Sequence, residues 1–154
     1  MMSIAQRLAE LEISLPEAPS PVAAYVPAVQ TGSLVFVSGQ VPMVEGNLVC
    51  TGSVPSVVSP AEATVAARQC AINALAVLSA HLGGDLDRIQ RIVRLGVFVA
   101  SDTGFHDQPK IANGASELLQ DVFGDAGRHA RAAVGSIALP LGATVEVELI
   151  AEVG

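Results

Sequence analysis

The sequence predicts an α+β fold in which one sheet is covered on one face by two helices. Residues 59–82 carry a capped, alanine-rich helical pattern, and residues 91–100 return to the two-residue period of a strand. The closing run Val145-Glu146-Val147-Glu148-Leu149 has the same period, with acids at every second position. Long helices interleaved with strands of this kind are typical of a sheet with a helical layer.

The composition indicates a single domain that assembles with further subunits. A chain of 154 residues suits one domain. Hydrophobic residues make up 51% of the chain and charged residues 15%, which is more apolar surface than a small monomer hides. The predicted order of hairpin, helix, strand, helix, strand and strand leaves one sheet face uncovered, so we expect another copy of the chain to cover it.

The first 19 residues are predicted to be an appendage to a domain that spans residues 20–154. Ser3 suits the N-cap of a short amphipathic helix that runs to Glu12. Prolines 16, 19 and 21 then favour an extended arm.

A hairpin is predicted next. Residues 33–38 form a strand that Gly39-Gln40-Val41-Pro42 ends. The turn residues Glu45-Gly46-Asn47 then lead to a second strand at residues 48–51.

Two helices flank the strand at residues 91–100. Ser59 and Glu62 form a capping box around Pro60, and Gly83-Gly84 ends the helix after Leu82. A second helix fits residues 108–123 and is ended by Gly124. The strand between them is expected to place four apolar side chains on one face, namely Val93, Leu95, Val97 and Val99.

The last two strands are predicted to form an antiparallel hairpin, because residues 139–143 contain the proline and glycine of a tight reversal. In that pairing residue 146 faces residue 136, which is roughly 16 Å along the strand from Arg131. One subunit would keep Arg131 and Glu146 apart, and a site shared across a subunit boundary would bring them together.

Charge and cysteine content argue against several classes of function. Eight basic and fifteen acidic residues give a net charge of −7, with Lys110 as the one lysine, so we expect no nucleic-acid partner. Cys50 and Cys70 have no further ligands at metal-binding spacing, and we expect neither a disulfide nor a metal site. No signal core or membrane-length apolar run is visible, so we expect a cytoplasmic protein with no membrane partner.

Arg131 and Glu146 are the candidate functional residues. Arg131 is flanked by alanines, so its guanidinium suits a bidentate carboxylate, although a lone arginine commonly pairs with an acid on the next strand. Glu146 and Glu148 share one face, either as a polar outer face or, if a subunit desolvates one of them, as an acid or base for a bound water. Arg128 and His129 precede the strand and suit solvated positions.

Several motifs in combination resemble the Rid or YjgF family, the reactive intermediate deaminases once labelled L-PSP endoribonucleases. They are Tyr25–Val29 ahead of Leu34–Pro42, Asn113 within a helix, Arg131, and the closing Val145–Glu148. The resemblance covers roughly residues 20 to 153. Asp107–Lys110 and Gly127–Arg131 resemble a longer branch of the family, in which the N-terminal helix and arm are extra.

This resemblance implies a chorismate-mutase-like α+β fold, with one mixed sheet and two helices on one face, assembled as a homotrimer with clefts between subunits. In the deaminating members the arginine that matches Arg131 grips the carboxylate of a 2-aminoacrylate-type enamine or imine. The glutamate that matches Glu146 positions the hydrolytic water, without metal or organic cofactor.

The resemblance also assigns residues to the lining of the cleft and shows one departure. Ala132 and Ala133 stand where the deaminases carry a small hydroxyl residue and then a cysteine or similar residue, so backbone groups serve there. The further matches to cleft-lining residues are Tyr25, Ser38, Gly39 and Asn113.

Two functions stay open at this stage. One is an enamine or imine deaminase, and the other is a non-catalytic protein that senses or sequesters a small carboxylate at the same clefts. A binding protein needs Arg131 but not Glu146, so the pair favours the enzyme only modestly. Ribonuclease activity has the older family label behind it but not the charge.

Overall fold

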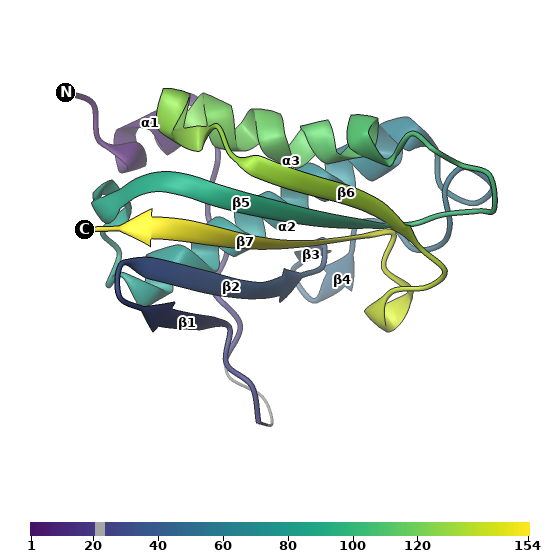
Figure 1. The fold of residues 1–154 in the computed structure, drawn as a ribbon, viewed down its shortest axis with the longest axis horizontal. Helices are drawn as coiled ribbons and strands as arrows, with labels where there is room; N and C mark the ends of the chain where they lie inside the picture. The colour runs from purple at the N-terminus through teal and green to yellow at the C-terminus, as the bar shows by residue number, and fades with distance from the viewer. Residues whose placement is uncertain (21–23) are drawn as a thin grey trace.

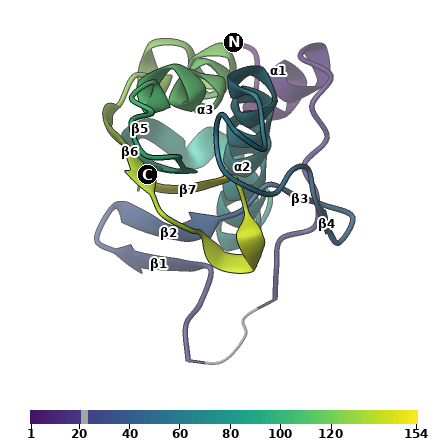
Figure 2. The ribbon, with the colours of Figure 1, turned by 90° about the vertical axis from the view of Figure 1, so that its right-hand side faces the viewer.

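The computed structural model describes residues 1–20 and 24–154 and shows one sheet with helices on one side (Figures 1 and 2). The main sheet has five strands in the order β1-β2-β7-β5-β6, and β3 and β4 form a separate two-stranded sheet. The predicted α+β fold with a mixed sheet is confirmed. The elements in chain order are α1 (Ile4–Glu10), β1 (Ala28–Thr31), β2 (Leu34–Gln40), β3 (Met43–Val44), β4 (Asn47–Leu48), α2 (Pro60–His81), the 3₁₀ turn η1 (Leu86–Arg88), β5 (Ile89–Ala100), α3 (Gln108–Phe123), η2 (Gly124–Gly127), β6 (Ala130–Ser136), η3 (Pro140–Gly142) and β7 (Val145–Val153).

Both long helices begin and end where the sequence predicts. The capping box of α2 is formed, with the Ser59 hydroxyl accepting from the Glu62 amide and the Glu62 side chain accepting from the Ser59 amide. Helix α2 packs on β2 and β7, and α3 packs on β5 and β6. Helix α2 is also long and apolar enough to cross a membrane, but 67% of its most apolar 18-residue window is buried inside this domain, as in a core helix.

The alternation of β7 divides its side chains between the two faces of the sheet. Its burial alternates strictly from Val145 to Val153, with the odd-numbered residues buried and the even-numbered ones partly exposed. The predicted shared face of Glu146 and Glu148 is therefore confirmed. In β5, Leu95, Val97 and Val99 are buried as predicted.

The expectation that Val93 joins this apolar face of β5 is wrong. The register between β5 and β7 shifts between Ile92 and Arg94, and Ile92 is the buried residue there. A bulge of this kind reverses the alternation for the residue that it contains.

The predicted antiparallel pairing of the last two strands is also wrong, because β5 lies between β6 and β7. Strand β6 pairs in parallel with β5, while β7 pairs antiparallel with β5. Parallel neighbours need a crossover, which α3 supplies. Residues 137–144 therefore pass over the end of β5 rather than form a tight hairpin.

The first hairpin has different partners from those predicted. Strand β2 pairs with β1 through a turn at Gly32-Ser33, and not with residues 48–51. The turn at Glu45-Gly46 does form, but it joins the short strands β3 and β4. Both turn residues have positive φ (49° and 82°), as a two-residue hairpin turn of type I′ requires.

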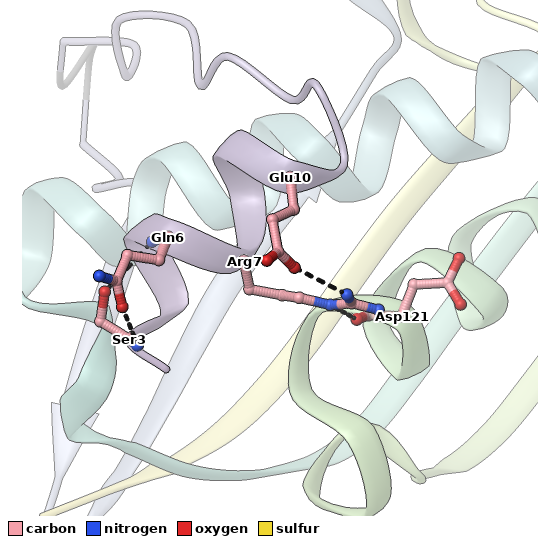
Figure 3. A network of polar contacts seen from close by, with 5 residues as sticks. All are labelled: Ser3, Gln6, Arg7, Glu10 and Asp121. Carbon is pink, nitrogen blue, oxygen red and sulfur yellow. Dashed lines mark hydrogen bonds and ion pairs between the residues drawn. The ribbon is translucent and has the colours of Figure 1, made fainter. Parts of the chain in front are cut away.

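Helix α1 lies against the helical layer (Figure 3). The Arg7 Nε atom donates to the Asp121 carbonyl oxygen of α3 at 2.7 Å, and the Ile4 amide donates to Asp87 Oδ1 at 2.7 Å. Leu8 and Ile13 are buried in the domain's core. Pro21 of the predicted arm lies outside the described residues.

The second face of the sheet has no covering element among the described residues. Large apolar side chains on it remain exposed, with exposed fractions of 54% for Val29, 42% for Phe36 and 47% for Val134. Cys70 of α2 is buried and Cys50 is half-buried, and both are free cysteines.

Gly114 of α3 allows the two long helices to pack closely. This close packing leads to a first prediction. A Cβ atom there would lie inside van der Waals contact of the Thr64 carbonyl oxygen of α2. An Ala in place of Gly ordinarily stabilises a helix, but here we expect Gly114→Ala to lower the free energy of unfolding by about 1–3 kcal/mol, because backbone must move. Urea or thermal unfolding measures this. The exposed Glu117→Ala of the same helix should change it by less than about 0.5 kcal/mol, and a gain in stability from Gly114→Ala would contradict the prediction.

Candidate functional site

The predicted site residues lie in two groups, and Glu146 of β7 centres the first. Gly39 lies at the irregularity in the pairing of β2 with β7, between Val37 and Gln40. A Cβ atom on Gly39 would collide with the Glu146 carboxylate, so that carboxylate packs directly against the glycine backbone. The absence of a side chain at position 39 thus makes room for the Glu146 carboxyl group.

Ser38 ties the segment around Tyr25 to this group. The Ser38 hydroxyl donates to the Val26 carbonyl oxygen at 2.8 Å, and the Ser38 amide donates to the Pro27 carbonyl oxygen at 2.8 Å. Tyr25 directly precedes Val26 in the sequence, and 61% of its surface is exposed. The structure therefore brings Ser38, Gly39 and Glu146 together where β2 pairs with β7, and it holds the residues that follow Tyr25 against Ser38.

The surroundings of Glu146 favour a protonatable carboxyl. Partial burial raises the pKa of Glu146, and the neighbouring charge of Glu148 raises it further. Glu148 forms an ion pair with Arg94 Nη1 at 3.3 Å. A cavity of about 380 Å³ is lined by Phe36, Ser38, Arg94 and Glu148 among others, but not by Glu146.

Arg131 of β6 centres the second group and faces α3. Its Nη1 atom donates to Asn113 Oδ1 at 2.8 Å and to Ser116 Oγ at 3.1 Å. Both acceptors are neutral, and no carboxylate of residues 1–20 and 24–154 pairs with Arg131. The guanidinium therefore keeps an uncompensated charge, which suits an anionic ligand. Ala133 lies two residues along on the same face of β6 and packs against the core.

A cavity of about 230 Å³ lies against Arg131. Its other lining residues come from the end of α3 and from the turn into β6, and they are Ser116, Gln120, Gly127, Arg128 and His129. Arg128 forms an ion pair with Asp125, with 3.6 Å between Arg128 Nε and Asp125 Oδ1. The cavity is thus lined by basic and neutral polar groups, which suits a small acid.

One chain keeps the two groups apart. Arg131 pairs with Leu95 of β5, which is buried beneath the helices, whereas Glu146 pairs with Phe98 of β5 and points to the uncovered face. Two strand spacings and three residues of rise separate their Cα atoms by roughly 14 Å. Arg131 and Glu146 therefore lie on different faces as well as on different strands.

His129 is not the solvated residue that the sequence suggested. It is half-buried, its Nδ1 atom lies 2.6 Å from the Gly127 carbonyl oxygen, and its Nε2 atom lies 2.9 Å from Ser116 Oγ. Ser116 follows Asn113 by three residues and His129 precedes Arg131 by two. Those spacings place each pair on one face of a helix or strand, and this signal was present in the sequence.

A metal centre is not formed by the described residues. Within residues 1–20 and 24–154, no group of three His, Cys, Asp or Glu side chains is placed to hold a metal ion. The functional groups that the structure places in the two groups of residues include a guanidinium and a carboxyl group.

Comparison with known proteins identifies relatives over most of the chain. A 2-iminobutanoate/2-iminopropanoate deaminase from Dermatophagoides farinae is 33% identical over 139 residues, which is 90% of this chain and 92% of that protein. Among solved structures, Atu1372 from Agrobacterium tumefaciens, a protein of unknown function, is 46% identical with a TM-score of 0.90, over 97% of this chain and 91% of that one. The YjgF gene product of E. coli is 26% identical with a TM-score of 0.62, over 99% and 98% of the two chains.

The family model described as "YjgF/chorismate_mutase-like, putative endoribonuclease" matches residues 5–153, which include most of α1 and every strand of the main sheet. This match confirms the resemblance drawn from the motifs at Tyr25, Arg131 and Glu146. The chain belongs to the YjgF/chorismate mutase-like family, together with Rid-type deaminases.

Proposed function

We propose that the protein is a homotrimer that binds small carboxylates in clefts between subunits and hydrolyses reactive enamines and imines of the 2-aminoacrylate type. The observation that carries this proposal is the division of the site residues into two groups on opposite faces of one sheet. Each group supplies what the other lacks, since Arg131 is a receptor for an anion and Glu146 is a base for water. A second subunit that brought its Glu146 group to the first subunit's Arg131 would complete a site.

The chemistry needs only those two groups and a water. An enamine first takes a proton on its terminal carbon and becomes an iminium ion, which loses a proton from nitrogen to give the imine, whose carbon is electrophilic. Arg131 holds the carboxylate while Glu146 takes a proton from the water, whose oxygen forms a bond to the imine carbon as the C=N π bond breaks. The proton that Glu146 took and a further proton from water give nitrogen its leaving form as ammonia, the C–N bond breaks as the hydroxyl loses its proton to water and the C=O bond forms, and ammonia and a 2-keto acid leave.

A non-catalytic carboxylate-binding protein is the alternative, and one observation favours it. Ala132 and Ala133 leave backbone groups alone where the deaminases carry a hydroxyl residue and a cysteine or similar residue. Release of ammonia and keto acid from freshly generated 2-aminoacrylate distinguishes the enzyme from the binding protein. The net charge of −7 disfavours RNA as the substrate.

Assembly is the first test. Light scattering should give a mass three times the 15.7 kDa of one chain, because the uncovered face exposes apolar side chains that water wets poorly. Phe36→Glu places a charge on that face and should dissociate the trimer. Val65→Glu, at a 59% exposed position on α2, is the matched control and should not. A wild-type monomer at micromolar concentration would overturn the shared-site proposal.

Removal of the base is the second test. Glu146→Gln should abolish imine hydrolysis while it leaves assembly and carboxylate binding largely intact, because it keeps the shape and removes the proton acceptor. As the pH is lowered, wild-type activity should begin to fall at a higher pH than it would with an ordinary glutamate. The reason is that Glu146 acts as a base only when it is ionised, and its pKa is raised.

Glu148→Gln is the control for that test. It should keep most of the turnover and move the acid limb to lower pH, because it removes a charge that raises the pKa of Glu146. Unchanged turnover by Glu146→Gln would remove this residue from the mechanism.

Loss of the guanidinium fork is the third test. Arg131→Lys keeps the charge but loses the two-pronged geometry, so binding of pyruvate, 2-ketobutyrate or serine should weaken by about 1.5–3 kcal/mol. Calorimetric titration measures the change, with Arg131→Ala alongside. If a carboxylate binds Arg131→Ala as well as wild type, the arginine is structural and the site lies elsewhere.

A further inference from the structure

We propose that Ser116 and His129 are positioning residues, which hold the Arg131 guanidinium so that its Nε–Nη2 edge receives the ligand carboxylate. The inference rests on the proposed function, because it takes Arg131 to be the carboxylate receptor. It adds two residues to the site and specifies which edge of the guanidinium binds.

The direction of each hydrogen bond follows from its fixed end. A carbonyl oxygen only accepts, so the contact of 2.6 Å between His129 Nδ1 and Gly127 O places a hydrogen on Nδ1. In the neutral ring Nε2 is then an acceptor, and the Ser116 hydroxyl at 2.9 Å donates to it. The hydroxyl hydrogen of Ser116 is thereby turned away from Arg131.

The Ser116 oxygen consequently offers its lone pairs to the guanidinium. Arg131 Nη1 carries two hydrogens, and it donates to Ser116 Oγ at 3.1 Å and to Asn113 Oδ1 at 2.8 Å. Both hydrogens of Nη1 are therefore in use. A carboxylate that approached the end of the guanidinium would need one of them, whereas one that approaches from the side uses Nε and Nη2.

Contacts with the rest of the domain position the elements that carry these groups. Asn113 and Ser116 lie one turn apart on α3, on either side of the glycine that contacts the Thr64 carbonyl oxygen of α2. His129 is fixed by its bond to Gly127, the last residue of η2. Because hydrogen bonds to Asn113 and Ser116 already restrain the guanidinium, it loses less conformational freedom when a ligand binds, and its affinity for the carboxylate is higher.

Calorimetric titration of the full-length protein with pyruvate and 2-ketobutyrate tests the inference. Ser116→Ala should raise the Kd by about five- to tenfold, as expected when a hydrogen bond that orients a charged group is lost. Ser116→Thr keeps the hydroxyl and should restore most of the affinity. His129→Leu should weaken binding, whereas His129→Gln, whose Oε1 atom takes the place of Nε2, should not. Ser136→Ala is the control, because this β6 hydroxyl donates to the Ala138 carbonyl oxygen and to no other group within residues 1–20 and 24–154.

A double-mutant cycle separates positioning from general stability. In an Arg131→Lys background, Ser116→Ala should have no further effect on Kd, because lysine has no Nη1 to hold. An equal loss in both backgrounds, or a wild-type Kd for Ser116→Ala, would overturn the positioning role. If Arg131→Ala abolishes binding while Ser116→Ala and His129→Leu do not weaken it, this inference alone fails. If Arg131→Ala binds as wild type, or if no carboxylate binds the wild type, the proposed function fails with it.

Discussion

Every second residue of β7 is buried against the helical layer, and this constraint determines where the charges of the chain lie. Because the period of a strand is two, burial of Val145, Val147 and Leu149 sends Glu146 and Glu148 to the opposite face. The buried face is dry and apolar, so a carboxylate could not be placed there without a partner. The acids therefore gather on the one face that the chain leaves uncovered, beside exposed apolar residues that favour contact with another copy.

Helix α3 lies on the other face of the same sheet, where it contacts Arg131. It packs on β5 and β6 and presents Asn113 and Ser116 to Arg131. The position of α3 depends on Gly114, which lets the backbone of α2 approach. It also depends on Arg7 of α1, which donates a hydrogen bond to the Asp121 carbonyl oxygen near the C-terminal end of α3. The N-terminal helix thus contacts the element that holds Arg131, although the two lie far apart in the sequence.

Local patterns predicted the elements well because their causes are local. The capping box at Ser59 and the glycine at 124 mark helix ends through contacts within a few residues, and the alternation at Glu146 is visible in five letters. Strand order was not predictable in this way. The choice between β7 and β5 as the partner of β6 depends on packing over the whole sheet, and the bulge at Ile92–Arg94 arises only once strands pair. The contact of His129 with Ser116 was missed for a related reason, since it joins helix α3 to the residue that precedes β6, thirteen residues later.

The observed strand order, like the hairpin predicted from the sequence, keeps Arg131 and Glu146 apart within one chain. In that hairpin residue 136 would face Glu146, and Arg131, five positions from residue 136, would already lie on the opposite face, because successive residues of a strand alternate between faces. In the structure they lie on opposite faces, and a strand changes faces only by slipping one residue, which would expose its whole buried side to water. For β7 that side comprises five buried residues from Val145 to Val153, so no rearrangement of one chain brings the two groups together at tolerable cost. We infer that if both residues act on one ligand, they come from two chains.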